Sequence, residues 1–215
     1  MTSKNRYARR SHISEGTVRD LIKLFAEGET SSGIARALKL NRNTVNRYLT
    51  GIRKRIAVFC EAGYLSKSAD YELYCVQMRQ CDRGYDPKEE QDAATSFAVI
   101  ISSDSSRLHA QILSGGSLPE MLAADGWIRH NCLGEFGYMG FFRPEKTESG
   151  GFSPTTRYRK ILRLRELLRQ RFSILRGIQR QTFYLHLKEC EFRCNYSGRD
   201  IYAAVLRIIQ EDPLD

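Results

Sequence analysis

The chain has 215 residues, a length that fits one compact domain together with a smaller one. Its hydrophobic fraction of 41% is ordinary for a globular protein. The sequence contains no run of about 18 apolar residues, so we expect no membrane span. The basic N-terminus lacks the apolar stretch of a secretory signal, so we expect a cytoplasmic protein whose six cysteines are thiols.

The net charge of +9 is unevenly distributed along the chain. Residues 1–60 hold 13 Lys/Arg against 4 Asp/Glu, residues 61–155 hold 8 against 14, and residues 156–215 hold 13 against 7. Basic clusters neutralise phosphates and release counterions, so the two basic ends favour nucleic acid as a partner. A merely solvated surface can also carry such charge, so charge by itself is weak evidence.

The N-terminal residues predict three helices. The first, 14–27, has Ser14 as its N-cap, ends at Gly28 and repeats apolar residues at helical spacing. The second helix begins between residues 30 and 32, and the third, 41–63, is capped by Asn41. The residues expected to face inward are Val18, Leu21, Ile22 and Phe25, then Ile34, Ala37 and Leu38, then Val45, Tyr48, Leu49 and Ile52.

Two short helices followed by a longer one are typical of a helix-turn-helix, in which the start of the last helix enters the DNA major groove. Arginine bonds guanine there, asparagine bonds adenine, and the threonine methyl meets the thymine methyl. The residues expected to reach base edges are Arg42, Asn43, Thr44, Asn46 and Arg47. The residues expected on phosphates are Arg53, Lys54 and Arg55, with Arg6, Arg9 and Arg10 as a basic arm. The alternative is a small helical cap whose polar face is only solvated.

The middle of the chain predicts β-structure. Segments 71–78 and 96–113 predict a strand and a β-hairpin, because β-branched and aromatic residues there are bounded by polar turns. The further helices predicted are 117–124, part of 125–138, 157–175, 180–195 and 199–210. Helix 157–175 is strongly basic, and its apolar stripe consists of Ile161, Leu164, Leu168 and Phe172.

Two long segments, LNRNTVNRYLTGIRKRI (40–56) and TFYLHLKECEFRCNYSGRDIY (182–202), resemble the two ends of the ISXO-type insertion-sequence transposases. Between them, ADGWIRHNCLGEFGY (124–138) is similar to the SDGW segment of that family. The resemblance implies an α+β chain with an all-α helix-turn-helix domain at 1–62. It implies a ribonuclease H-like domain at 63–215, with a mixed α/β sheet and the C-terminal helices.

Members of this family need three acidic residues, which hold two Mg²⁺ ions for strand transfer. By the resemblance, these positions fall on Tyr74, Asp125 and about Leu162. Tyrosine and leucine cannot hold Mg²⁺, and Glu166 can replace Leu162 only if the helix shifts. The family's basic, Gly-rich loop corresponds to residues 81–94, which are acidic here. The resemblance therefore implies a catalytically inactive relative that keeps the fold and DNA binding, with Asp125 as a remnant.

The leading interpretation is a sequence-specific double-stranded DNA-binding protein of transposase descent, without a cofactor. It would act as a transcriptional regulator or DNA-architecture factor on the bacterial nucleoid, and helix-turn-helix proteins often form homodimers. The first alternative is an active Mg²⁺-dependent transposase in which Asp125 and Glu166 are joined by Asp70 or Glu72. The second is a protein-interaction module that docks a partner through the acidic residues 82–92. The third, a degenerating gene product, is disfavoured by the intact apolar pattern.

A partial metal site is the other chemistry considered. His186, Cys190 and Cys194 recur at a spacing that would place them on one face of a helix. A lone C-x3-C spacing is weak evidence for a metal, and no C-x2-C pair occurs in the sequence. We therefore expect no metal at these residues.

Overall fold

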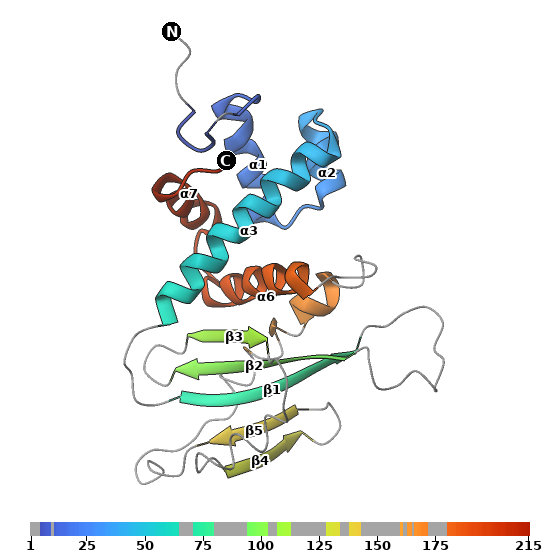
Figure 1. Ribbon diagram of the computed structural model, residues 1–215, viewed down its shortest axis with the longest axis vertical. Coiled ribbons are helices and arrows are strands. Elements are labelled where there is room, and N and C mark those ends of the chain that lie inside the picture. Colours follow the sequence, from blue (N-terminus) through green and yellow to red (C-terminus); the bar gives the residue numbers. More distant parts are fainter. Residues whose placement is uncertain are drawn as a thin grey trace, which may run out of the picture. The chain divides into compact units, whose positions relative to one another are not determined.

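The computed structural model describes residues 5–9, 11–64, 71–79, 94–102, 107–112, 128–133, 138–142, 160, 163–164, 166–171 and 180–215. The chain forms two compact units, one of Met1–Leu65 with Tyr196–Asp215 and one of Ser66–Asn195. Along the sequence, helices come first and last, and five β-strands lie between them in chain order (Figure 1). None of the helices described in these ranges is long and apolar enough to cross a membrane.

The first unit begins with helices α1 (Glu15–Glu27) and α2 (Ser31–Leu38). Ser14 and Thr30 cap them, each side-chain oxygen accepting a hydrogen bond from a backbone N–H in the first turn, at 3.1 and 3.0 Å. Gly28 ends α1 in the left-handed conformation, with φ 91°. Both helices and the caps predicted for α1 are confirmed.

Helix α3 (Arg42–Tyr64) packs against α2 and against the C-terminal helix of the chain. Every inward residue predicted for α1 and α3 is buried. One inward prediction for α2 is wrong, because Ala37 is exposed. Ile34 is fully buried and Leu38 half-buried, so the packed face of this short helix is centred between them and turns Ala37 towards solvent.

Helix α7 (Ile201–Glu211) packs against α1 and α3 and buries Val205, Ile208 and Ile209. A helix at 199–210 was predicted, and its existence is confirmed. The sequence grouped it with residues 63–215, whereas residues 196–215 belong to the first unit. The reason is that an amphipathic pattern shows which face of a helix is apolar but not which other helices that face will cover.

The second unit contains a five-stranded sheet with the order β3-β2-β1-β5-β4 (Figure 1). Its strands are β1 (Tyr71–Arg79), β2 (Ala94–Ser102), β3 (Leu108–Ile112), β4 (Ile128–Leu133) and β5 (Tyr138–Phe142). The strand predicted at 71–78 and the hairpin predicted at 96–113 are confirmed. Strand β1 lies in the middle of the sheet and pairs with β2 on one side and β5 on the other.

The sheet differs from the expectation in two ways. The resemblance implied a mixed sheet, but the pairings among these five strands are all antiparallel. A helix was expected within 125–138, but Ile128–Leu133 is a strand paired with β5. Only residues 134–137 separate β4 from β5, a hairpin length that antiparallel strands can close and parallel strands cannot. The aromatic-rich partner strand decided the conformation of this short segment.

Helix α6 (Arg180–Asn195) packs against β3, the strand at one end of the sheet order. The Asn195 amide accepts from the backbone N–H of Leu108 at 2.8 Å and donates to its carbonyl at 2.7 Å. A Glu191 carboxylate oxygen accepts from the N–H of Ala110 at 3.0 Å. Side chains of α6 therefore satisfy backbone groups on the outer side of β3.

The helix predicted at 180–195 is thereby confirmed. The basic helix predicted at 157–175 is described at residues 160, 163–164 and 166–171, which are helical, and there Leu164 and Leu168 are buried. The helix predicted at 117–124 lies outside the described residues.

Candidate nucleic-acid interface

A tight turn joins α2 to α3. Lys39 has φ 53°, in the left-handed region, and the backbone N–H of Leu40 donates to Ala35 O at 2.9 Å. This hydrogen bond is typical of a Schellman turn, which ends one helix and turns the chain sharply. The Asn41 side chain then accepts from the N–H of Asn43 at 2.8 Å and caps α3, as predicted.

The first half of α3 has one packed face and one solvent face. Arg42, Asn43, Asn46 and Arg47 are exposed, and Thr44 is half-buried. Within the part of the chain that the structure describes, no hydrogen bond or ion pair engages the side chains of Arg42 or Asn46. The structure thus places all five expected base-reading residues together on one helix, four of them exposed and Thr44 half-buried.

Tyr48 fixes the packed side of this half of α3. Its ring is buried, at 3% exposure, and its hydroxyl lies 2.8 Å from the Ser11 hydroxyl. The Arg47 guanidinium carbon lies 5.5 Å from the centre of the Tyr48 ring, within the range of a cation–π contact. Tyr48 therefore orients Arg47 as well as anchoring α3. No local sequence pattern predicts the contact between Tyr48 and Ser11, because it joins residues far apart in the chain.

The three cations expected on phosphates have different surroundings. Arg53 is half-buried, with its guanidinium carbon 5.8 Å from the centre of the Phe25 ring. Lys54 is exposed. The side chain of Arg55 is only 14% exposed and forms ion pairs with Asp212 at 3.1 Å and Asp215 at 3.3 Å. Lys54 is thus the best-placed of the three for an incoming phosphate, and Arg55 is already paired.

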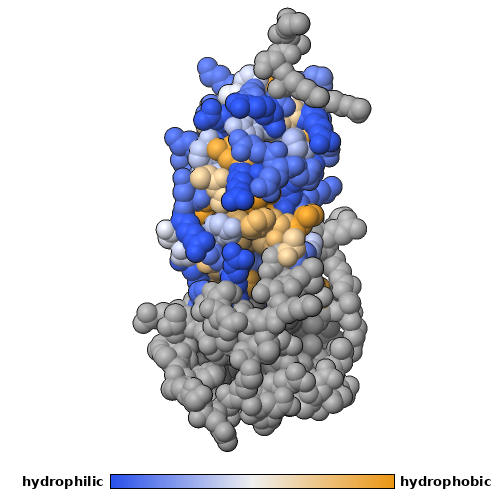
Figure 2. Space-filling view, turned by 90° about the vertical axis from the view of Figure 1, so that its left-hand side faces the viewer, coloured by the Kyte–Doolittle hydropathy of each residue, from blue (hydrophilic) through white to orange (hydrophobic). Residues whose placement is uncertain are grey.

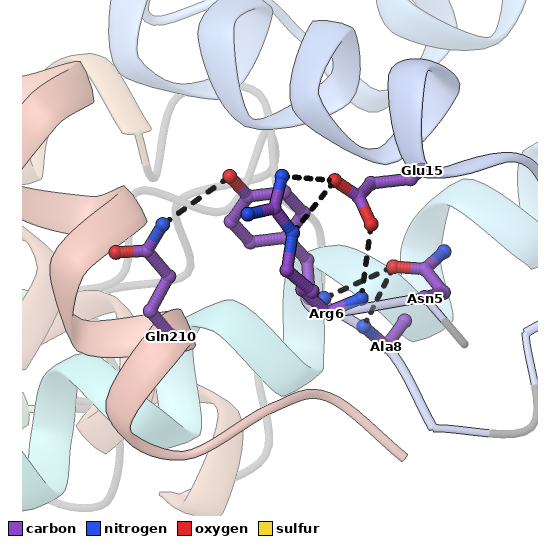
Figure 3. Close-up of polar contacts among 6 residues, drawn as sticks. Asn5, Arg6, Ala8, Glu15 and Gln210 are labelled. Carbon is purple, nitrogen blue, oxygen red and sulfur yellow. Dashed lines mark hydrogen bonds and ion pairs between the residues drawn. The ribbon is translucent and has the colours of Figure 1, made fainter. Parts of the chain in front are cut away.

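The expected basic arm is partly neutralised. Arg6 forms a two-point contact with Glu15, at 2.9 and 3.1 Å from Oε1, and Figure 3 shows the two side chains facing each other. Hydrogen bonding to Arg6 holds the pKa of Glu15 below its usual range, and the same contact raises the pKa of Arg6. The backbone N–H of Arg9 bonds Leu214, and Arg10 lies outside the described residues.

The exposed face of α3 changes character beyond Lys54. Val58 is 68% exposed, and no other large hydrophobic residue in the described ranges is exposed. On the face of the molecule shown in Figure 2, the coloured surface is mostly hydrophilic and includes a hydrophobic area. The exposed polar residues named above on α3 therefore span Arg42 to Lys54.

The positions implied for transposase acids are only partly described. Tyr74 lies on β1, opposite Val99 of β2 and Gly140 of β5. Asp125 and Leu162 lie outside the described residues. The carboxylate of Glu166 accepts from Arg169 at 2.8 and 2.9 Å, in an exposed contact. Glu166 is thus engaged in a local ion pair on its own helix.

His186, Cys190 and Cys194 are all buried on α6. Burial raises the pKa of the Cys194 thiol to about 12 and also raises that of the Cys190 thiol, which opposes the thiolate form that a metal requires. Among the residues that the structure describes, no group of three or more His, Cys, Asp or Glu side chains could hold a metal.

Helix α6 also buries charged residues that the sequence analysis did not single out. Lys188 Nζ lies 2.9 Å from Glu191 Oε2, and Arg193 Nε lies 2.9 Å from Glu189 Oε1. Arg171 also pairs with Glu189. The spacings of three and four residues are the available sequence signal, because they bring opposite charges together on a helix. Each of these pairs brings opposite charges together, which offsets part of the cost of burying them.

A depression of about 360 Å³ lies on the first unit, beside the exposed face of α3. Its lining comprises Asn46, Arg47, Tyr48, Thr50, Gly51, Lys54, Arg55, Leu214 and Asp215. The first seven belong to α3, and the last two come from the C-terminal segment, which sequence reasoning did not connect with this helix. Comparison with protein-family models, with curated proteins and with solved structures found no match for this chain.

Proposed function

We propose that this protein binds double-stranded DNA, with α2 and α3 acting as a helix-turn-helix and the first half of α3 lying in the major groove. Arg42, Asn43, Asn46 and Arg47 would read base edges, with Thr44 beside them. Lys54 would contact a phosphate, and Arg53 would support it from its position over Phe25.

One observation carries this proposal. Exposed arginine and asparagine side chains occupy the solvent face of successive turns at the start of α3, directly after a tight turn from α2. These are the residue types that make two-point contacts with guanine and adenine. A helix that served only as a solvated cap would not need this grouping at its N-terminal end.

We further propose that the chain descends from ISXO-type transposases and lacks strand-transfer activity. The support is the resemblance of segments 40–56 and 182–202, together with Tyr74 and Leu162 at two of the three acidic positions. A DNA-binding protein without catalysis would act as a transcriptional regulator or DNA-architecture factor on the nucleoid, without a cofactor. A homodimer on two half-sites fits this role.

The test begins with in vitro selection of DNA bound by the full-length protein. On the selected duplex, Arg42→Ala and Asn43→Ala should each weaken binding by about 1–3 kcal/mol and relax the preference at one base pair. Lys54→Ala should weaken binding to all sequences alike and reduce the magnitude of the salt slope by about 0.9. Fluorescence anisotropy over a salt series measures both effects.

Arg207→Ala is the matched control, since it also removes one exposed arginine, from α7. If Arg42→Ala and Asn43→Ala bind the selected site no more weakly than Arg207→Ala, α3 is not the reading helix. Incision or joining of the selected DNA by wild-type protein with Mg²⁺ or Mn²⁺ would overturn the non-catalytic part of the proposal. In that case Asp125→Ala should abolish the activity.

A further inference from the structure

The C-terminal segment Asp212–Asp215 is fixed directly against α3. Leu214 forms a parallel β-bridge with Ala8, and its N–H donates to Tyr7 O at 2.9 Å. The Leu214 side chain is 1% exposed, and a Cβ added to Gly51 of α3 would lie 3.1 Å from Leu214 Cδ2. Gly51 therefore allows the segment to approach the helix closely.

The Tyr7 side of this contact is also tied to α7. Figure 3 shows Gln210 reaching the N-terminal segment, where its amide donates to the Tyr7 hydroxyl at 3.3 Å. Asn5 accepts from the backbone N–H groups of Tyr7 and Ala8 at 3.0 and 3.1 Å. The bridge that holds Leu214 thus rests on an ordered N-terminal segment.

This segment covers one cation of α3 with two carboxylates. The Arg55 guanidinium donates to Pro213 O at 2.9 Å and forms the ion pairs with Asp212 and Asp215. The carboxylates remain open to solvent, at 60% and 84% side-chain exposure, whereas Arg55 is 14% exposed. The surface at this point therefore presents negative charge in place of the positive charge of Arg55.

The Asp215 carboxylate lies beside the proposed DNA surface. Asp215 lines the depression together with Arg47 and Lys54. A phosphate that approached Lys54 from this side would meet the Asp215 carboxylate, and like charges at short range repel. Carboxylate and phosphodiester are also alternative partners for a guanidinium, and the carboxylates of the same chain have the advantage of a high effective concentration.

We propose that Asp212–Asp215 is an autoinhibitory contact that competes with DNA phosphates for Arg55 and lowers the affinity for every duplex. This inference rests on the proposed DNA binding by α3. Arg42 lies about 20 Å along the helix from Arg55, beyond the Debye length of about 8–10 Å at moderate salt. The contact therefore weakens backbone binding near Arg55 and leaves the base contact of Arg42, at the start of α3, unaltered.

The experiment compares Asp215→Asn and Asp212→Asn with Glu211→Gln in the full-length protein. Each change removes one exposed carboxylate charge, but Glu211 pairs with Arg207 rather than with Arg55. Affinities for the selected duplex and for a scrambled duplex are measured from about 0.1 to 1 M salt. A matched thermal unfolding curve for each variant establishes that the fold is kept.

Asp215→Asn should steepen the salt slope by up to about 0.9. When the salt is lowered from about 1 M to 0.1 M, the affinity of the variant should therefore rise roughly eightfold more than that of wild type. Asp212→Asn should act in the same direction, and the gain should appear on both duplexes. If neither variant binds DNA more tightly than Glu211→Gln, while wild type does bind DNA, the autoinhibitory contact is refuted and the proposed function stands. If wild type binds neither duplex, both proposals fail.

Discussion

Lys39 stands where the chain turns from α2 into α3, in a conformation that lysine rarely adopts. Its φ of 53° is the one positive φ of a non-glycine residue within the described ranges. The left-handed conformation costs a residue with a Cβ about 1–2 kcal/mol. The positive charge at the C-terminal end of α2 recovers about 0.3–1 kcal/mol, so strain outweighs the gain. Gly28 fills the equivalent position after α1 without that strain.

Lys39→Gly should therefore raise the free energy of unfolding by about 0.5–1 kcal/mol. The reverse change at the matched position, Gly28→Ala, should lower it by about 1 kcal/mol or more, because alanine is strained at a φ of 91°. Urea unfolding followed by circular dichroism measures both changes. A destabilised Lys39→Gly protein would show that the lysine side chain makes a favourable contact that outweighs the backbone strain.

At the scale of elements, α6 acts as a substitute neighbour for the edge strand β3. Asn195 forms two hydrogen bonds with the backbone of Leu108, in the pattern that another strand would provide. An exposed edge strand is an aggregation hazard, and covering it with a helix is one way to prevent edge-to-edge pairing. These hydrogen bonds also fix the C-terminal end of α6 to the sheet.

Asn195→Ala should lower the free energy of unfolding by about 1–3 kcal/mol for each Leu108 backbone group left without its partner. The control is Asn46→Ala, the same substitution on the exposed face of α3, which should change stability by no more than about 0.5 kcal/mol. Hydrogen exchange at Leu108 gives the local readout and should accelerate only in Asn195→Ala. Equal exchange in both variants would mean that the edge does not depend on the Asn195 amide.

At the scale of the whole molecule, the two ends of the chain build one unit. Helix α7 supplies buried apolar residues to the same core as α1 and α3, and Leu214 adds another. Each such side chain contributes about 1.5–3 kcal/mol by burial. The stability of the proposed DNA-binding helices should therefore depend on residues at the far end of the sequence.

Ile209→Ala should lower the free energy of unfolding by about 2–5 kcal/mol, since Ile209 is fully buried. Hydrogen exchange should show the loss of protection in α1 and α3 as well as in α7. Arg207→Ala, an exposed position on the same helix, should leave protection unchanged. Loss confined to α7 would mean that this helix unfolds separately from the helices it covers.

The local elements were largely predictable from sequence, because their signals lie within a few residues. Ser14 and Gly28 fixed the ends of α1, and the spacing of Val45, Tyr48, Leu49 and Ile52 identified the buried face of α3. The exposure of Arg42, Asn43, Asn46 and Arg47 followed from the same helical periodicity. The short strands β4 and β5 were missed, because their conformation depends on pairing with each other and with β1.

By itself, the sequence determined where α1, α2, α3, α6 and α7 form and which residues α3 exposes, since capping and periodicity are local properties. Only the tertiary structure decided that residues 196–215 join the N-terminal helices and that Asp212 and Asp215 cover Arg55. The physical reason is that a helical pattern gives the direction of an apolar face, whereas the partner of that face depends on packing between residues far apart in the chain. The sequence therefore predicted Arg55 as a phosphate ligand, and the fold paired it with the carboxylates of its own chain.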